Sequence, residues 1–281
     1  MSSRQIRIAF LGDIFGAPGR RVVEQQLPVL RAEHAPDLIV ANAENCSRGS
    51  GLSPDLYRKL RGFGIDAITL GDHVYRDQRI VQVMEREGEP IARPANLPSQ
   101  ATGRRFTRIP IPGADRDLLI ITVLGRVFFP IPADDPFAAV DGILASLRGP
   151  APIVLVEAHM EATSEKAAMG HHLDGRVAAV FGTHTHVPTA DARILPGGTA
   201  FMSDVGMCGP YDSCIGRDKR AVVRHMTTGM YVPFDIADGD AAMCGALVDV
   251  DVDRGRAMAV QPLRYEGDYS REPFSGALSR Q

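Results

Sequence analysis

Gly182-Thr183-His184-Thr185-His186 follows directly on the apolar run Val177-Ala178-Ala179-Val180-Phe181. The apolar run predicts a buried strand of a parallel sheet, which ends at the glycine. In an extended segment residues i and i+2 point the same way, so we expect the imidazoles of His184 and His186 to face one point. Histidine is the commonest metal ligand and a frequent proton carrier, so the pair indicates a metal site or an acid/base site. Two polar residues in an exposed loop are the alternative for this pair taken alone.

Four other apolar runs end in the same way, each followed within a few residues by a carboxylate, an amide or an imidazole. The runs and the residues after them are 6–11 with Asp13, 38–41 with Glu44 and Asn45, 67–70 with Asp72 and His73, and 153–156 with Glu157 and His159. In open α/β sheets, ligands bind beyond the carboxyl ends of the strands. We therefore expect the five strand ends to converge on one site.

Composition and charge narrow the class of protein. The chain has 281 residues and a net charge of −3, which does not favour a partner as polyanionic as a long nucleic acid. Its four cysteines show no Cys-x-x-Cys spacing, so a zinc knuckle is not expected. No signal peptide is recognised and no apolar run approaches the roughly 20 residues of a membrane span, so we expect a cytoplasmic protein without a membrane partner. A homo-oligomer is left open.

Strands and helices alternate over the first third of the chain, which predicts a parallel sheet with right-handed crossovers. A turn-rich loop is expected at 14–19, followed by helices at 20–33, 54–63, 77–86 and 137–147. Ser164 is expected to cap a short helix that ends near residue 171. Beyond His186 the pattern is mainly β. We expect one domain over residues 1–265, with a two-sheet core and outer helices, and a polar tail over 266–281.

Seven side chains at the strand ends are candidate metal ligands: Asp13, Glu44, Asn45, Asp72, His159, His184 and His186. One zinc ion takes about four ligands, so seven groups exceed one ion and match two ions that share a bridging carboxylate. Mixed imidazole and carboxylate ligands suit iron, manganese or zinc better than calcium or magnesium. Two such ions clamp a phosphoryl group and activate a water between them.

His73 follows Asp72 directly and need not be a ligand itself, so it is well placed to protonate a leaving oxygen. An eighth metal ligand, or a donor to one of the ligands, is the alternative for this residue.

Two competing motifs are weaker. Gly12, Gly16 and Gly19 lack the spacing of a dinucleotide loop, and Asp13 would repel a phosphate there unless a cation intervened. Ser164 lacks the surroundings of a nucleophile elbow, which favours its role as a helix cap.

These motifs, in this order, resemble those of the calcineurin-like metallophosphoesterases. The more specific resemblance is to their YmdB-type branch, the 2′,3′-cyclic-nucleotide phosphodiesterases, and it extends over residues 6–265. It rests on 12–20, Arg93-Pro94-Ala95-Asn96, 161–166, 182–194, Asp204-Val205-Gly206-Met207 and Gly209-Pro210-Tyr211-Asp212.

The resemblance implies an α/β fold, a four-layer α-β-β-α sandwich with two metal ions. It implies that one ion is held by Asp13, Glu44, Asn45 and His186. It implies that the other is held by Glu44, Asp72, His159 and His184, with Glu44 bridging. Iron or manganese is the expected pair, with zinc as an alternative. A metal-bridging hydroxide would then hydrolyse a small phosphodiester such as a 2′,3′-cyclic nucleotide, with His73 as the proton donor.

One residue departs from the family motif, which has asparagine where this chain has Asp72. The extra carboxylate should strengthen the binding of divalent cations and weaken the attraction for an anionic phosphate. A metal-binding regulatory or scaffold protein, with a detuned site and little catalysis, is therefore the alternative function.

Overall fold

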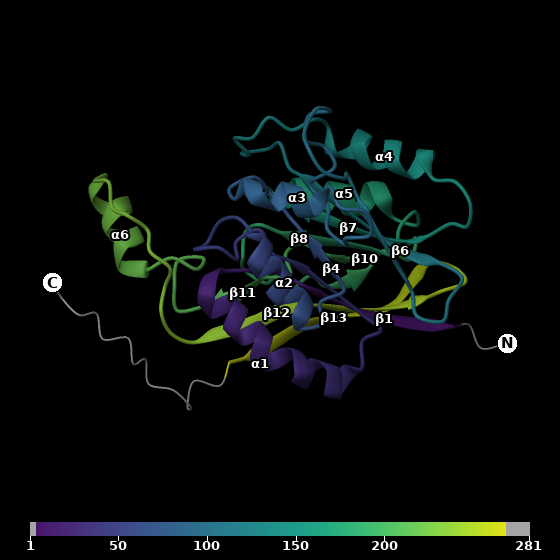
Figure 1. The fold of residues 1–281 in the computed structure, drawn as a ribbon, viewed down its shortest axis with the longest axis horizontal. Coiled ribbons are helices and arrows are strands. Elements are labelled where there is room, and N and C mark those ends of the chain that lie inside the picture. The colour runs from purple at the N-terminus through teal and green to yellow at the C-terminus, as the bar shows by residue number, and fades with distance from the viewer. Residues whose placement is uncertain (1–3, 268–281) are drawn as a thin grey trace.

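The computed structural model describes residues 4–267, in which two β-sheets lie face to face between two layers of helices (Figure 1). The first sheet has the strand order β2 (Asp13–Ile14), β11 (Met207–Pro210), β12 (Ala241–Asp251), β1 (Gln5–Leu11), β3 (Leu38–Asn42) and β4 (Ala67–Thr69), with β13 (Arg256–Glu266) paired to β12. The second has the order β5 (Thr107–Pro110), β6 (Asp117–Leu124), β7 (Ile153–His159), β8 (Ala179–Thr183), β10 (Ala200–Met202) and β9 (Arg193–Ile194).

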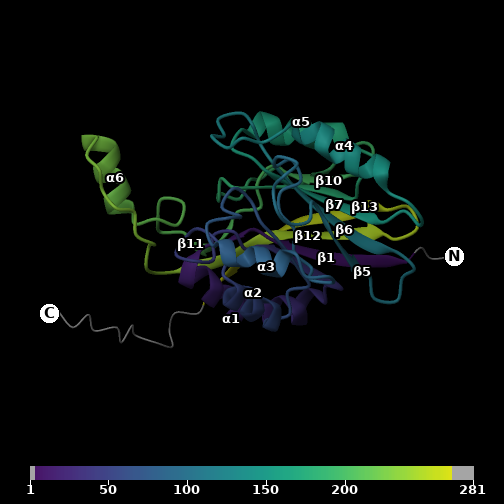
Figure 2. The same ribbon diagram turned by 45° about the horizontal axis from the view of Figure 1, so that its top comes forward.

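Helices cover the outer face of each sheet. The described helices are α1 (Gly16–His34), α2 (Pro54–Gly62), the 3₁₀ turn η1 (Gln78–Ile80), α3 (Val81–Met84), α4 (Pro136–Ser146), α5 (Thr163–Leu173) and α6 (Lys219–Thr228). In the turned view α4 and α5 lie over the second sheet, and α1 and α2 lie on the far side of the first (Figure 2). The predicted four-layer α-β-β-α sandwich is confirmed.

The alternation of side chains along the strands builds this sandwich. Ile8 and Phe10 of β1 lie in the core between the two sheets, whereas Ala9 and Leu11 face the core under the helices of the first sheet. Strand β6 divides its apolar residues in the same way between the inter-sheet core and the core beneath α4 and α5. Because successive residues of a strand point to opposite faces, a continuous apolar run supplies two cores at once.

Parallel pairing brings the site-bearing strand ends together. Strand β3 pairs parallel with both β1 and β4, and β7 pairs parallel with β8. The carboxyl ends of parallel neighbours emerge at the same edge of a sheet. The five predicted strand ends therefore belong to two sheets, not to one, and meet where the carboxyl edges of these sheets face each other.

Three predicted element boundaries are wrong. Residues 16–19 of the expected loop at 14–19 are instead the start of α1, where Pro18 is tolerated because the first helical turn needs no intrahelical N–H donors. Ser164 is not a cap: Ala162 holds the N-cap position of α5 without a side-chain hydrogen bond. The helix expected over 77–86 is only η1 and the single turn α3. Ser53 caps α2, and its side chain accepts a hydrogen bond from the Leu56 amide.

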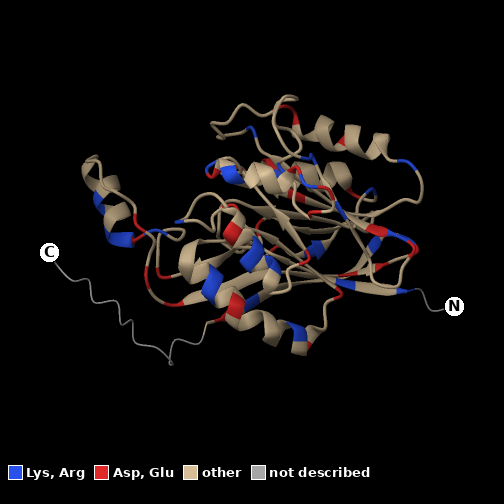
Figure 3. Ribbon diagram, viewed as in Figure 1, with Lys and Arg blue, Asp and Glu red and all other residues tan. Residues whose placement is uncertain are grey.

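The region after His186 was predicted as mainly β, but it also contains α6, which stands apart from the sandwich in both ribbon views (Figures 1 and 2). Basic and acidic residues, blue and red on the ribbon, are interspersed along the helices that face the viewer in Figure 3. No helix within residues 4–267 is long and apolar enough to cross a membrane. Of the predicted polar tail, Glu266 is the last residue of β13, and residues 268–281 lie outside the described part of the chain. The single domain over 1–265 stays a prediction.

Candidate metal centre

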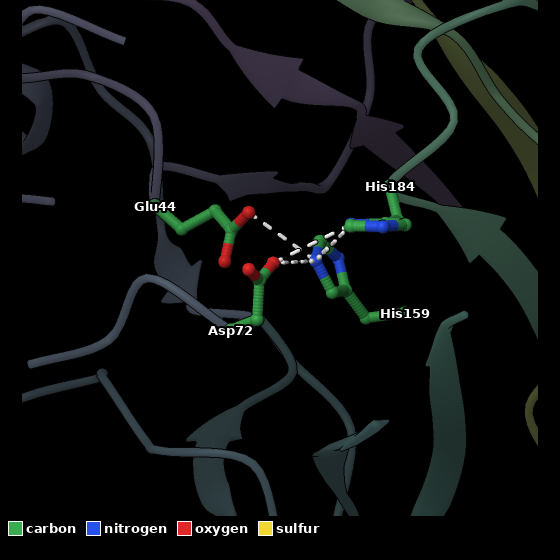
Figure 4. Close-up of side chains that lie close together, drawn as sticks. All are labelled: Glu44, Asp72, His159 and His184. Carbon is green, nitrogen blue, oxygen red and sulfur yellow. Dashed lines mark hydrogen bonds and ion pairs between the residues drawn. The ribbon is translucent and has the colours of Figure 1, made fainter. Parts of the chain in front are cut away.

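Four of the seven predicted ligands form one tight cluster, which Figure 4 shows in close-up. Glu44, Asp72, His159 and His184 each offer one ligand atom, and these atoms lie within 4.8 Å of one another. Glu44 and Asp72 follow β3 and β4 of the first sheet, while His159 ends β7 and His184 follows β8 of the second. The cluster therefore joins the facing edges of the two sheets.

His159 is fully buried, and its Nε2 lies 3.0 Å from Asp72 Oδ1 and 3.2 Å from Glu44 Oε1. Its other ring nitrogen, Nδ1, lies 2.9 Å from Thr183 Oγ1, and that hydroxyl donates to Glu157 Oε1 at 2.8 Å. Because the hydroxyl proton is already given to Glu157, Thr183 accepts from the Nδ1–H of the imidazole. This tautomer leaves the Nε2 lone pair directed at the two carboxylates, as a metal ligand requires.

Glu157 is another buried carboxylate, and its hydrogen bonds connect the two sides of the cluster. Besides Thr183, Glu157 accepts from Asn42 Nδ2 and from Thr122 Oγ1, both at 2.7 Å. Asn42 Oδ1 in turn accepts from the Glu44 amide at 2.9 Å. Glu157 is thus tied to His159 in one sheet and to Glu44 in the other. The sequence places Glu157 directly after the apolar run 153–156, but it was not among the seven candidate ligands.

His184 completes the cluster on the side that faces the cavity. Its Nδ1 lies 3.2 Å from His159 Nε2 and 3.4 Å from Asp72 Oδ1, and its Nε2 lies 3.3 Å from Glu161 Oε2. Two imidazole nitrogens this close to one another, with carboxylate oxygens beside them, are arranged as ligands around a shared cation. Glu161 on the far side of the ring fixes its orientation, a role that the sequence did not indicate.

The charges of the cluster shift the ionisation of its members. Burial alone would raise the pKa of Asp72, but its contacts with His159, His184 and His73 hold that pKa well below its usual range. Burial would lower the pKa of His159, but the charge of Glu44 and the contact with Asp72 raise it well above its usual value. A proton and a metal ion therefore compete for the same imidazole nitrogen, so metal binding should release protons.

Position 71 requires a glycine because the side chains of Glu44 and His159 lie very close to its backbone. A Cβ at this position would lie 2.3 Å from both Glu44 Oε2 and His159 Nε2, far inside van der Waals contact. Any larger residue would displace one of the two side chains. The glycine thus allows the backbone after β4 to approach the cluster closely.

The other three predicted ligands lie beside the cluster without forming part of the four-atom group. Asp13 is fully buried and accepts from the His184 amide at 3.1 Å through Oδ2. Its Oδ1 and the Oδ1 of Asn45 are buried and have no hydrogen-bond partner among residues 4–267. His186 Nδ1 lies 3.0 Å from the Ile215 carbonyl, to which it donates, so Nε2 is left as a lone-pair donor.

The structure corrects the conformation predicted for the His-x-His segment. Strand β8 ends at Thr183, and His184 and His186 have positive φ values of 88° and 66°. The two rings are therefore not on one side of an extended strand. Both nevertheless line the same cavity, because the chain turns twice through the left-handed region.

His73 lines the same cavity, and its imidazole is partly exposed. The backbone amide of His73 donates to Glu44 Oε2 at 3.0 Å. The ring nitrogen Nδ1 lies 3.1 Å from Asp72 Oδ2, but the angles do not allow a hydrogen bond between them. Burial would lower the pKa of the imidazole, but the carboxylates of Asp72 and Glu44 outweigh burial and raise it. A raised pKa favours the protonated form that a general acid needs.

The residues present fit a metal centre. Buried oxygens of Asp13 and Asn45 that have no hydrogen-bond partner among residues 4–267 lie beside a cluster of two imidazoles and two carboxylates, and such oxygens are costly to bury unless a cation satisfies them. The cavity above has a volume of about 330 Å³, which suits a small substrate. The donor set matches transition metals that accept both nitrogen and oxygen ligands.

Known proteins are similar to this chain over nearly its whole length. The family model described as "YmdB-like protein" matches residues 9–263. A Bacillus subtilis (strain 168) protein named 2′,3′-cyclic-nucleotide 2′-phosphodiesterase is 38% identical over 264 residues, which cover 94% of this chain and 98% of the relative.

Two solved structures are also similar. A hypothetical protein from Thermus thermophilus has a TM-score of 0.86 and 42% identity, covering 94% of this chain and 100% of that one. A novel phosphatase from Mycoplasma pneumoniae has a TM-score of 0.88 and 31% identity, covering 95% and 96%. From its sequence and its fold, the chain belongs to the family of YmdB-like proteins.

Proposed function

We propose that this protein is a metal-dependent phosphodiesterase with two metal ions, acting on small phosphodiesters of the 2′,3′-cyclic-nucleotide class. The observation that carries the proposal is the four-residue cluster of Glu44, Asp72, His159 and His184 at the facing edges of the two sheets. The activity named for the Bacillus subtilis relative supports the substrate class.

The seven candidate ligands divide into two sets. Glu44, Asp72, His159 and His184 would hold one ion. Asp13, Asn45 and His186 would hold the second, with Glu44 shared between them. Iron or manganese is the proposed metal, with zinc as an alternative. When bound, such ions neutralise the phosphodiester charge and lower the pKa of a bound water.

The protein's own groups orient the site and move the proton. Glu157 and Thr183 fix the tautomer of His159, and Glu161 holds His184. His73 lies at the cavity wall with an imidazole whose pKa is raised, so it is the proposed proton donor to the leaving oxygen.

Metal content and turnover test the function together. We expect about two metal ions per chain, and hydrolysis of both bis-p-nitrophenyl phosphate and 2′,3′-cyclic AMP that is lost on chelation and restored by manganese. The measurements are elemental analysis of the purified protein and steady-state rates before and after treatment with EDTA. Two bound metal ions without turnover of either ester would favour a metal-binding regulatory protein in place of an enzyme.

The role of His73 is tested by its dependence on the leaving group. His73→Ala should lower kcat for 2′,3′-cyclic AMP by about 10²- to 10⁴-fold, because its alkoxide leaving group needs a proton. The loss for bis-p-nitrophenyl phosphate should be much smaller, because p-nitrophenolate leaves without one. His171→Ala, which removes an exposed imidazole from α5, is the control and should change neither rate. Equal losses on the two esters would assign His73 to metal binding or to structure.

A further inference from the structure

One positive side chain lines the cavity above the metal centre. Among the residues lining it, Arg217 is the single lysine or arginine, whereas Glu44, Asp72 and Glu161 all contribute carboxylates. Arg217 belongs to the segment that leads from β11 to α6, far in sequence from the strand ends that carry the ligands. Apart from any bound metal ions, an anionic substrate entering this cavity therefore meets three carboxylates and one guanidinium.

The guanidinium of Arg217 is held in place by neutral groups. It stacks on the ring of Phe15, with its Cζ 5.0 Å from the ring centroid. A Cβ on Gly49 would lie 2.7 Å from Nη2 and 2.8 Å from Cζ, so the glycine backbone closes around the guanidinium and Phe15. Rigid placement of this kind is typical of a binding group, because little conformational entropy is lost when a ligand binds.

Among the described residues, the guanidinium of Arg217 donates only to neutral carbonyl groups. Its positive charge therefore has no anionic partner in this part of the chain, and its Nε–H has no acceptor. Nη1 donates to the carbonyls of Arg48 and Phe234 at 3.4 and 3.1 Å, and Nη2 donates to the Gly49 carbonyl at 3.2 Å. Within residues 4–267, Nε has no hydrogen-bond acceptor and no carboxylate forms an ion pair with the guanidinium. Asp235 acts on Arg217 only through longer-range attraction. A partly buried cation without an anionic partner is matched to an anion supplied by a ligand.

The same segment also supports the metal centre. The Ile215 carbonyl accepts the hydrogen bond from His186 Nδ1, and the Phe15 ring contacts the His186 ring edge to face, with centroids 5.4 Å apart. Arg217 is thus placed beside a proposed metal ligand.

We propose that Arg217 is the substrate-binding residue of this site, donating hydrogen bonds to the anionic phosphoryl oxygens of the phosphodiester. This inference rests on the proposed function. A contact made equally in the bound substrate and the transition state contributes to KM and leaves kcat nearly unchanged. Loss of a charge-assisted hydrogen bond corresponds to roughly a 10- to 100-fold loss of affinity.

The test compares Arg217→Met with Arg217→Lys and Arg220→Met. Arg217→Met should raise KM for 2′,3′-cyclic AMP by roughly 10- to 100-fold, with kcat changed less than about threefold. Arg217→Lys keeps the charge but not the planar fork, so its KM should lie between wild type and Arg217→Met. Arg220→Met removes an equal charge from the start of α6, outside this cavity, and should leave KM unchanged.

Thermal unfolding and metal content separate binding from structure. If Arg217 only braces the loop, Arg217→Met will lower the melting temperature, the metal content and kcat while KM stays at the wild-type value, which would overturn the proposal. Should Arg217→Met fail to fold, Arg217→Lys decides: a raised KM at an unchanged melting temperature supports the proposal, and an unchanged KM refutes it.

Calorimetry with inorganic phosphate, on the manganese-loaded protein, keeps this inference distinct from the proposed function. Wild-type protein that hydrolyses neither ester, yet binds phosphate at least tenfold more tightly than Arg217→Met, would overturn the function and support Arg217 as an anion site. Hydrolysis by both proteins, with equal KM and equal phosphate affinity, would support the function and overturn the inference.

Discussion

Replacing Glu44 with glutamine should abolish hydrolysis, lowering kcat/KM by about 10³-fold or more, with little change in the free energy of unfolding. Both oxygens of this carboxylate are engaged: Oε1 lies 3.2 Å from His159 Nε2, and Oε2 accepts from the His73 amide at 3.0 Å. An amide must turn its NH₂ toward one of these positions. It therefore loses either the oxygen that faces the cluster or the acceptor that holds the backbone of His73.

Stability should respond far less than activity to this change. Glu44 is buried and shares the imidazole of His159 with Asp72, whose Oδ1 lies 3.0 Å from the same Nε2. The imidazole therefore keeps an anionic partner when Glu44 becomes a neutral amide of the same shape. The backbone of Gly71 packs closely against the carboxylate of Glu44, so a glutamine of the same shape should keep the position of the glutamate.

Asp72→Asn is the matched control, because it makes the same isosteric change in the same cluster. Its turnover should stay within about tenfold of wild type, since asparagine keeps one oxygen ligand and the family motif has asparagine here. Rates on bis-p-nitrophenyl phosphate, metal content and urea unfolding should be measured for both variants. Equal losses in the two variants, or substantial turnover by Glu44→Gln, would contradict a bridging role for Glu44. A large gain in rate with Asp72→Asn would show that the natural site is detuned.

The strand-end rule predicted which residues cluster at the candidate site because it depends on topology. Apolar runs are visible in the sequence, and parallel pairing must place their carboxyl ends at one edge. Glu44, Asp72, His159 and His184 were all named on this basis, and the structure brings them together. Division of the strands between two facing sheets did not affect the prediction, since both sheets present their carboxyl edges to the same point.

Local geometry was harder to predict, because it depends on contacts that no periodic pattern reveals. The rule that residues i and i+2 share a side holds only in an extended strand, and β8 ends before His184. The positive φ values of His184 and His186 are imposed by tertiary hydrogen bonds, including the one from the His184 amide to Asp13. Arg217 gave no sequence signal at all, because it lies in a segment between β11 and α6 without strand or helix periodicity.

A buried ion pair holds the turn that carries the two histidines, and its loss should be the most destabilising of the changes considered. Lys166 of α5 is 2% exposed, and its Nζ donates to Asp204 Oδ2 at 2.8 Å and to Thr185 Oγ1 at 3.2 Å. The same Asp204 oxygen accepts from the Thr185 amide at 3.1 Å and from its hydroxyl at 2.6 Å. Thr185 stands between two residues with positive φ, whose backbone strain must be offset by such contacts.

Lys166→Met should therefore lower the free energy of unfolding by about 3–5 kcal/mol, because it leaves the Asp204 carboxylate buried without a cation. Metal affinity should fall by about 10- to 100-fold, since the turn that places His184 and His186 loses its support. Urea unfolding and metal titration measure the two effects. Lys59→Met removes a lysine from an exposed pair with Glu24 and should change the unfolding free energy by at most about 1 kcal/mol.

The double variant Lys166→Met/Asp204→Asn distinguishes two effects of losing Lys166. One is the cost in stability of a buried, unpaired carboxylate, and the other is the loss of the contacts that position Thr185. If the unpaired carboxylate dominates, the neutral amide should recover much of the stability, because no charge is left buried. Metal affinity should not recover with it, since Thr185 would still lack the ammonium and carboxylate that fix its position. Recovery of both quantities would show that the ion pair acts on the metal centre through global stability alone, and that the His184–His186 turn needs no dedicated support.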